Sequence, residues 1–164
     1  MLDASGLIEK HRSNGVLVDA NLLVLYLVGK VNKNRIPTFK RTQQYTARHF
    51  ELLAGLIGHF GRAITTPHIL SQVSDLSALP GKELKAIRHC LKAEVEMMEE
   101  RYDESRMVVK DAAFEPLGLA DAAIVALCRR PLLVLTADLA LYLALQRRGA
   151  DAINFTDYLS SYWR

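Results

Sequence analysis

The sequence predicts an α/β fold with three layers, α/β/α, around a central parallel β-sheet. Apolar runs such as Val16–Val18 and Leu132–Leu135 are continuous rather than alternating, which is typical of strands buried on both faces. Segments with helical spacing of apolar residues separate these runs, so strands and helices alternate along the chain. The 164 residues, 50% of them hydrophobic, suffice for one well-filled core. We therefore expect a single domain over residues 1–164.

The first half of the chain contains two of the expected strands. Residues 1–14 are polar and are expected to form a lead-in or a short helical turn before the strand Val16–Val18. Asp19 ends that strand, and it is also a favoured N-cap for a helix over residues 22–28. A loop is expected up to Pro37, and apolar residues at helical spacing then predict a helix from about 38 to 60. A second strand is expected over 62–66.

The second half continues the alternation. Pro67 suits the first turn of a helix, which we expect over about 68–79, before Pro80 and Gly81. An amphipathic helix is expected over 82–101. The stretch 102–110 fits an edge strand or a helix, and we favour the helix. The remaining expected elements are a helix over 117–128, a strand over 132–135, a helix over 138–148, a strand over 152–155 and a terminal helix from 156.

Composition limits the classes of partner and compartment. The formal net charge is +3, which permits a partner that carries phosphates but does not require one. Cys90 and Cys128 lie far apart without CxxC spacing, which favours reduced thiols in a cytoplasm over a disulfide framework. The N-terminus lacks the apolar core of a signal peptide, and the apolar stretches are too short or are interrupted by Asp. We expect a soluble, cytoplasmic protein without a membrane segment.

Three acids follow the expected strands or start the expected helices. Asp19 ends the first strand, Asp138 follows the strand of residues 132–135 closely, and Asp121 lies in the first turn of the helix that precedes that strand. In a right-handed βαβ arrangement these positions meet at one edge of the sheet. Each acid also has a purely structural explanation as a helix cap or first-turn residue. Together, however, clustered carboxylates need a cation or a proton between them, and oxygen ligands suit Mg²⁺ or Mn²⁺.

Other chemistries lack their motifs. The chain has no GxxxxGK[ST] loop, no GxGxxG after a strand and no GxSxG turn, so the nucleotide-binding and serine-hydrolase patterns are absent. The five histidines show no zinc-like pairing with the cysteines.

Several segments resemble the PIN-domain ribonucleases. VLVDANLLV, TTPHILSQVSDL, LGLADAAIVAL, and VLTADLAL followed by GADAINF occur in the order of that family and span nearly the whole chain. The resemblance implies a central parallel sheet and a metal-dependent endoribonuclease. Because many members of the family are toxins of bacterial toxin-antitoxin pairs, it also implies RNA as substrate, with an antitoxin protein and a second copy in a homodimer as partners.

The resemblance assigns roles to individual residues. Asp19 matches the first acid and Asp121 the third, both as ligands of one metal, with Asn21 as a polar support. Asp138 matches the last acid, which holds a metal or orients the attacking water, and Thr136 matches the hydroxyl residue two positions before it. The cofactor implied is Mg²⁺ or Mn²⁺.

The chain departs from the family at the second acid, where Gln72 stands in the pattern TPHILxE. Glutamine offers a carbonyl oxygen but removes one negative charge from a site whose cation affinity depends on charge. Asp75, one turn further along the same helix, and Glu115 are candidates for compensation, although each is explained equally well as a solvated or loop acid. Two hypotheses follow: an active ribonuclease, or a catalytically impaired PIN-like module that binds RNA or a protein.

Basic residues provide a candidate RNA surface. They follow the first helix and extend into the start of the second one, and long-range charge would guide the RNA backbone without reading its bases. An ordinary solvated surface is the alternative explanation for each charge. The candidates are Lys30, Lys33, Arg35, Lys40 and Arg41.

Overall fold

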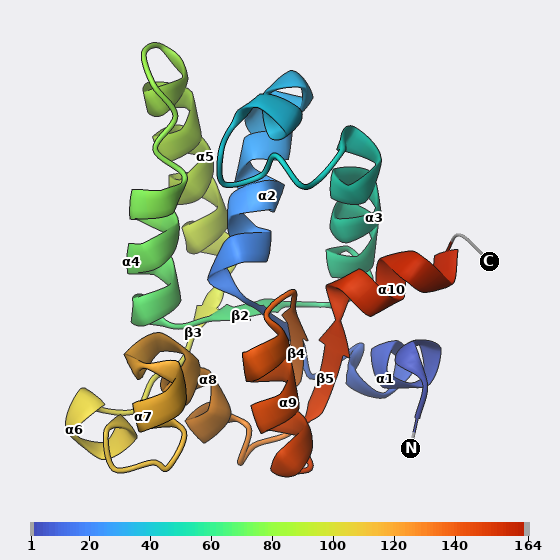
Figure 1. The fold of residues 1–164 in the computed structure, drawn as a ribbon, viewed down its shortest axis with the longest axis vertical. Coiled ribbons are helices and arrows are strands. Elements are labelled where there is room, and N and C mark those ends of the chain that lie inside the picture. The colour runs from blue at the N-terminus through green and yellow to red at the C-terminus, as the bar shows by residue number, and fades with distance from the viewer. Residues whose placement is uncertain (1, 163–164) are drawn as a thin grey trace.

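The computed structural model describes residues 2–162 and contains a five-stranded sheet in the order β3-β2-β1-β4-β5 (Figure 1). All neighbouring strands are parallel, which confirms the predicted fold class. Parallel order follows from the helical connection after each strand. The strands are β1 (Val16–Val18), β2 (Ala63–Thr65), β3 (Glu99–Glu100), β4 (Leu133–Thr136) and β5 (Asp151–Asn154).

Helices cover both faces of the sheet. In Figure 1, α2, α3, α4 and α5 lie on one side of it, and α8 and α9 lie on the other. Within the described residues, no helix has both the length and the apolar character needed to cross a membrane. The helices are α1 (Ala4–His11), α2 (Ala20–Val31), the 3-10 helix η1 (Lys33–Thr38), α3 (Ala47–Ile57), α4 (Pro67–Leu76), α5 (Glu83–Met97), α6 (Ser105–Val108), α7 (Phe114–Leu117), α8 (Leu119–Leu127), α9 (Leu139–Arg147) and α10 (Phe155–Tyr162).

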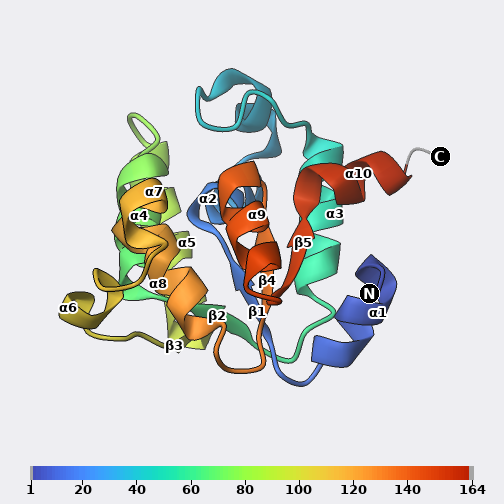
Figure 2. The ribbon, with the colours of Figure 1, turned by 60° about the horizontal axis from the view of Figure 1, so that its bottom comes forward.

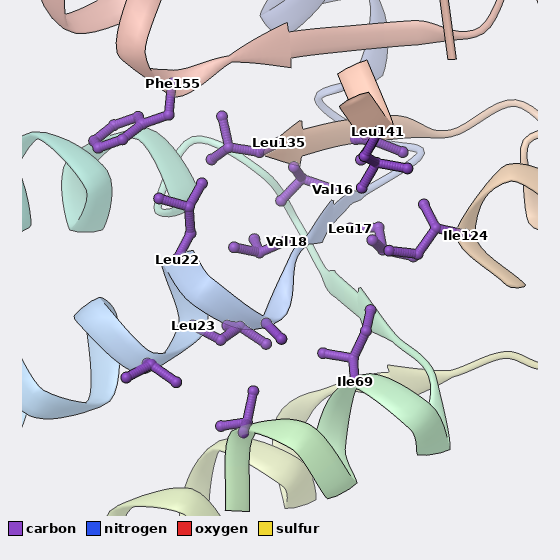
Figure 3. Packing of buried hydrophobic residues seen from close by; sticks show 14 of the residues in the cluster. Val16, Leu17, Val18, Leu22, Leu23, Ile69, Ile124, Leu135, Leu141 and Phe155 are labelled. Atoms are coloured by element: carbon purple, nitrogen blue, oxygen red, sulfur yellow. The ribbon is translucent and has the colours of Figure 1, made fainter. Parts of the chain in front are cut away.

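The central strand β1 organises the core. All three of its residues are buried, and its neighbours are β2 on one side and β4 on the other. Successive side chains of a strand point to opposite faces. Figure 3 shows Leu17 directed toward Ile124 of α8, whereas Val18 points to the side of α2, where Leu22 lies. Because both faces are covered by helices, a continuous apolar run is what this strand requires.

The helix predicted over 38–60 is wrong in its first part. Residues 33–38 form η1, a turn follows, and α3 begins only at Ala47. Thr46 sets that start, because its hydroxyl accepts a hydrogen bond from the His49 backbone N–H and the His49 ring accepts one from the Thr46 N–H, each at 3.3 Å. In the turn, the buried Thr42 hydroxyl donates to the Ile36 carbonyl at 2.8 Å. Hydrogen bonds of individual side chains, rather than the spacing of apolar residues, thus determine where α3 begins.

The N-terminal segment is more ordered than the expected lead-in or single turn. Residues 4–11 form the two-turn helix α1, whose N-cap Asp3 accepts a hydrogen bond from Gly6 at 2.8 Å. His11 is buried at its end, with Nε2 2.7 Å from the Asp151 carboxylate of β5. This contact fixes α1 beside β5.

The helix predicted over 82–101 ends earlier, at Met97, and is followed by the edge strand β3. Glu99 in this strand pairs with Arg62 at 2.7 Å and with Arg101 at 2.6 Å, so the edge of the sheet is highly charged. Charges of this kind protect an edge strand from pairing with other chains. The helix favoured within 102–110 is confirmed by α6.

The other predicted elements are confirmed with small shifts of their ends. These are β1, β2, α4, α8, β4, α9, β5 and α10, together with the helix that Asp19 caps.

Candidate functional site

Asp19 lies where β1 ends and α2 begins. Its backbone N–H donates to the Leu135 carbonyl of β4 at 3.0 Å, which continues the pairing of the two strands. Its Oδ1 accepts a hydrogen bond from the Leu22 N–H at 2.9 Å and so caps α2. Asp19 therefore caps α2 and also lies at the carboxyl end of its strand, and the sequence predicts both positions. The carboxylate is buried, with Asp19 only 4% exposed.

Thr136 connects Asp19 with Asp138. Its hydroxyl donates to Oδ2 of Asp19, and the Ala137 N–H donates to the same oxygen at 3.1 Å. The Thr136 hydroxyl also accepts a hydrogen bond from the Asp138 N–H at 2.9 Å. Asp138 in turn caps α9 by accepting from the Leu141 N–H at 3.0 Å. The ends of β1 and β4 are thus joined by one hydroxyl group.

Asp121 lies in the first turn of α8 and is partly buried. Burial raises the pKa of this carboxyl to about 6, and the negative charges of Asp138 and Asp19 add to the effect. No hydrogen bond opposes the rise. Burial is also the main cause that raises the pKa of Asp19, with a contribution from the charge of Asp138, against the hydrogen bonds that lower it. The charges of Asp138 and Asp19 therefore act on the Asp121 carboxyl, and the charge of Asp138 also acts on that of Asp19.

The donor set suits a hard divalent cation. Within residues 2–162, no three His, Cys, Asp or Glu side chains are arranged as a ready metal cluster. Mg²⁺ commonly needs only one or two carboxylates and completes its shell with water and substrate phosphate. A cation beside Asp121 would favour the ionised form of its carboxyl, whose pKa burial raises. The oxygen atoms of the three acids are of the kind that Mg²⁺ and Mn²⁺ prefer.

The second-acid position does not add a carboxylate. Gln72 is exposed on α4, a helix that packs against both α2 and α8. Asp75 on α4 and Glu115 on α7 are exposed as well. Only Asp138 and Asp19 act on the charge of Asp121, so the structure does not bring either candidate for compensation to the three acids. Asn21 is exposed in the first turn of α2.

Three of the five candidate RNA-binding residues are engaged in ion pairs. Lys30 pairs with Glu94, Lys33 with Glu51 at 2.9 Å and Arg35 with Glu83 at 3.2 Å. Lys30 also lies eleven residues beyond Asp19, about 16 Å along α2. These contacts connect α2 and η1 to neighbouring helices and explain the three charges structurally.

Lys40 and Arg41 differ from those three residues. Both are exposed in the turn after η1, and neither forms an ion pair with another described residue. Ion pairs within the described residues therefore do not account for these two charges.

Tyr45 belongs to the surroundings of the acids, although the sequence does not single it out. It is buried just before the Thr46 cap, and its ring lies 6.5 Å from that of Phe155. Burial raises the pKa of the Tyr45 hydroxyl, and the charge of Asp19 raises it further. The two residues are distant in sequence and come together only because the turn before α3 folds back over the sheet. Apolar spacing alone assigned Tyr45 to a helix face.

Fold and acids together define one candidate site at the carboxyl edge of the parallel sheet, the edge at which open α/β sheets bind ligands. Its members come from the ends of β1 and β4 and from the start of α8. The chain matches no model of a known protein family, no curated protein and no solved structure.

Proposed function

We propose that this protein is a PIN-like, divalent-metal-dependent endoribonuclease that hydrolyses RNA phosphodiester bonds. The observation that carries the proposal is that the Thr136 hydroxyl joins Asp19 to Asp138 at the carboxyl edge of a parallel sheet, and that the charges of both acids raise the pKa of Asp121. Topology alone brings these three positions to one edge of the sheet, but carboxylates placed there repel one another, and a bound cation relieves that repulsion.

Each acid would contribute differently to the reaction. Asp19 is held by three hydrogen bonds, so it offers a fixed carboxylate that needs little reorganisation. Asp121 would be the second ligand, and a cation beside it would favour its ionised form. Asp138 is anchored through Oδ1 to α9 and would use its other oxygen to orient the attacking water. The metal, when bound, supplies Lewis acidity toward the scissile phosphate and lowers the pKa of water.

The substrate and partners follow from the same proposal. Lys40 and Arg41 would guide the RNA backbone by charge, independently of sequence. The role of a toxin, with an antitoxin protein as partner and a homodimeric state, comes from the resemblance to PIN-domain toxins.

RNA cleavage in the presence of Mg²⁺ or Mn²⁺ tests the proposal. The natural chain is expected to cut a labelled single-stranded RNA internally, and EDTA is expected to stop the reaction. Asp121→Asn should lose most of this activity because it removes a ligand charge. Glu96→Gln is a matched control, since Glu96 is an exposed acid on α5 whose nearest cation, Lys92, is 3.9 Å away. Cleavage that persists in EDTA, or that survives in Asp121→Asn, contradicts the proposal.

A second candidate function is a catalytically impaired module that binds RNA or a protein. Gln72 favours it, because an exposed amide replaces the second acid and no neighbouring carboxylate acts in its place. The variant Gln72→Glu separates the two candidates. Cleavage by this variant alone supports the impaired module, whereas cleavage by the natural chain supports the enzyme.

A further inference from the structure

A groove runs along the outer edge of β5. Its volume is about 470 Å³, and all four residues of β5 line it. One wall comes from α1 and the other from the end of α9, while α10 closes one end. Figure 2 shows β5 as the last strand on this side of the sheet, with α1 and α10 beside it and α9 in front. Apolar side chains dominate the walls, among them Leu2, Leu7, Tyr142 and Tyr158.

The backbone of β5 is available for a further strand. Within the described part of the chain, β5 pairs only with β4, and no other backbone group hydrogen-bonds to residues 151–154. In a strand, alternate residues direct N–H and C=O to opposite sides, so half of these groups face the groove. The opposite edge of the sheet differs, because β3 has only two residues and carries ion-paired charges. The sheet thus protects one edge with ion-paired charges, whereas at the other edge, beside α1, the backbone of β5 lacks a second strand partner within the described residues.

The charge of the groove selects its occupant. Three carboxylates line it, and no lining residue is Lys, Arg or His, although the whole chain is basic. Asp151 is neutralised by Lys10, at 2.6 Å, and contacts His11. Asp3 and Asp157 form no ion pair with any described residue. Asp3 lies at the start of α1 and Asp157 in the first turn of α10, and their charges would attract cations and repel phosphates.

We infer that this groove binds an extended segment of a protein partner that alternates apolar and basic side chains and adds to β5 as a sixth strand. Backbone hydrogen bonds to β5 would supply affinity. The apolar walls, and the carboxylates of Asp3 and Asp157, which form no ion pair with a described residue, would supply selectivity. This inference does not depend on the nuclease proposal, since the groove is built from β5, α1, α9 and α10 and includes none of the three acids.

Model peptides test the inference on the full chain. The first probe is a fluorescein-labelled eight-residue peptide of alternating lysine and valine, and its counterpart alternates glutamate and valine. Two further lysine peptides carry N-methyl groups, one on every valine and one on every lysine, so that each lacks one set of backbone donors. Fluorescence anisotropy gives the affinities, and amide hydrogen exchange locates the contact.

The lysine peptide is expected to bind about tenfold more tightly than the glutamate peptide and to protect amides of β5 from exchange. One N-methylated peptide should lose about tenfold in affinity while the other binds normally. The double variant Asp3→Asn, Asp157→Asn should weaken binding several-fold, and Glu96→Gln should not. Asparagine is chosen because it retains the N-cap of α1.

Three results would overturn the inference: equal affinity for the two charge types, normal binding of both N-methylated peptides, or protection at a surface other than β5. Protection of β5 amides by a single-stranded RNA, added without any peptide, would also overturn it, because the groove should reject phosphates. Since all peptide comparisons use the natural chain, the outcome does not depend on the folding of any variant.

Discussion

The hydroxyl of Thr136, at the end of β4, donates a hydrogen bond to the carboxylate of Asp19, which lies 117 positions earlier at the end of β1. The same hydroxyl accepts from the backbone of Asp138. One buried side chain therefore holds two of the three acids in place. Asp19 and Asp138 are therefore fixed relative to each other, which two unconnected helix caps would not be.

Removing that hydroxyl is expected to destabilise the fold. Thr136→Val leaves Oδ2 of Asp19 with one donor fewer and the Asp138 N–H without its acceptor, in a buried position. A cost of about 1–3 kcal/mol in the free energy of unfolding follows. Urea denaturation measures it. Thr136→Ser keeps the hydroxyl and should recover most of the loss, and an equal loss in both variants would mean that packing rather than hydrogen bonding matters.

Asp121 should give the metal-free protein a characteristic dependence on pH. Its pKa rises from 3.8 to about 6 on folding, so the folded chain retains a proton that the unfolded chain releases. The stabilisation that this proton binding gives the folded state is present in full below about pH 4 and is lost as the pH rises through 6.

Asp121→Asn removes this loss. Compared with the natural chain in EDTA, the variant is expected to gain about 2 kcal/mol of stability between pH 4 and 7, after allowance for the partial exposure of the carboxyl. Thermal or urea unfolding at several pH values measures the difference between the two proteins. A difference that stays constant with pH would show that folding does not raise the pKa of Asp121.

Gln72→Glu should leave the metal-free fold almost unchanged, because Gln72 is exposed and surface substitutions usually change stability by less than about 0.5 kcal/mol. If α4 presents this position to the acids, an added carboxylate should raise Mg²⁺ affinity severalfold. Isothermal titration with Mg²⁺ measures the change. Glu96→Gln provides the control for altered net charge. Unchanged affinity in Gln72→Glu would place residue 72 outside the metal site.

Gly29 permits a close approach of α2 and α3. A Cβ atom at this position would come within 2.2 Å of the Phe50 ring, so the ring would have to move. Gly29→Ala is therefore expected to destabilise the fold by about 1–3 kcal/mol, despite the better helix propensity of alanine. Gly55→Ala on α3 is the matched control, since nothing lies within 4 Å of the added atom there. Similar unfolding midpoints for the two variants would contradict this reading of the helix contact.

The strands and most helices could be predicted from the sequence because burial on both faces leaves a direct pattern. Val16–Val18 is a continuous apolar run that Asp19 ends, so both the strand and its carboxyl end were predictable. The turn before α3 was not, because Thr42 and Thr46 fix it through individual hydrogen bonds that apolar spacing does not reveal. The short strand β3 was not predicted because it consists of two consecutive glutamates and lacks the apolar residues typical of a strand.

The candidate site was predictable in part for a similar reason. Asp19, Asp121 and Asp138 occupy strand ends and a helix start, and topology alone brings such positions together. Tyr45 and the ion pairs of Lys30, Lys33 and Arg35 depend on how the turn and the outer helices pack. Periodicity along one segment carries no information about such contacts between segments.

The most direct test of the central claim is cleavage of a labelled RNA by the natural chain during a Mn²⁺ or Mg²⁺ titration, in parallel with Asp121→Asn. The account predicts internal cleavage that rises with the metal, stops with EDTA and is nearly absent in the variant. Equal cleavage by both proteins, or no cleavage and no metal binding by the natural chain, would contradict it.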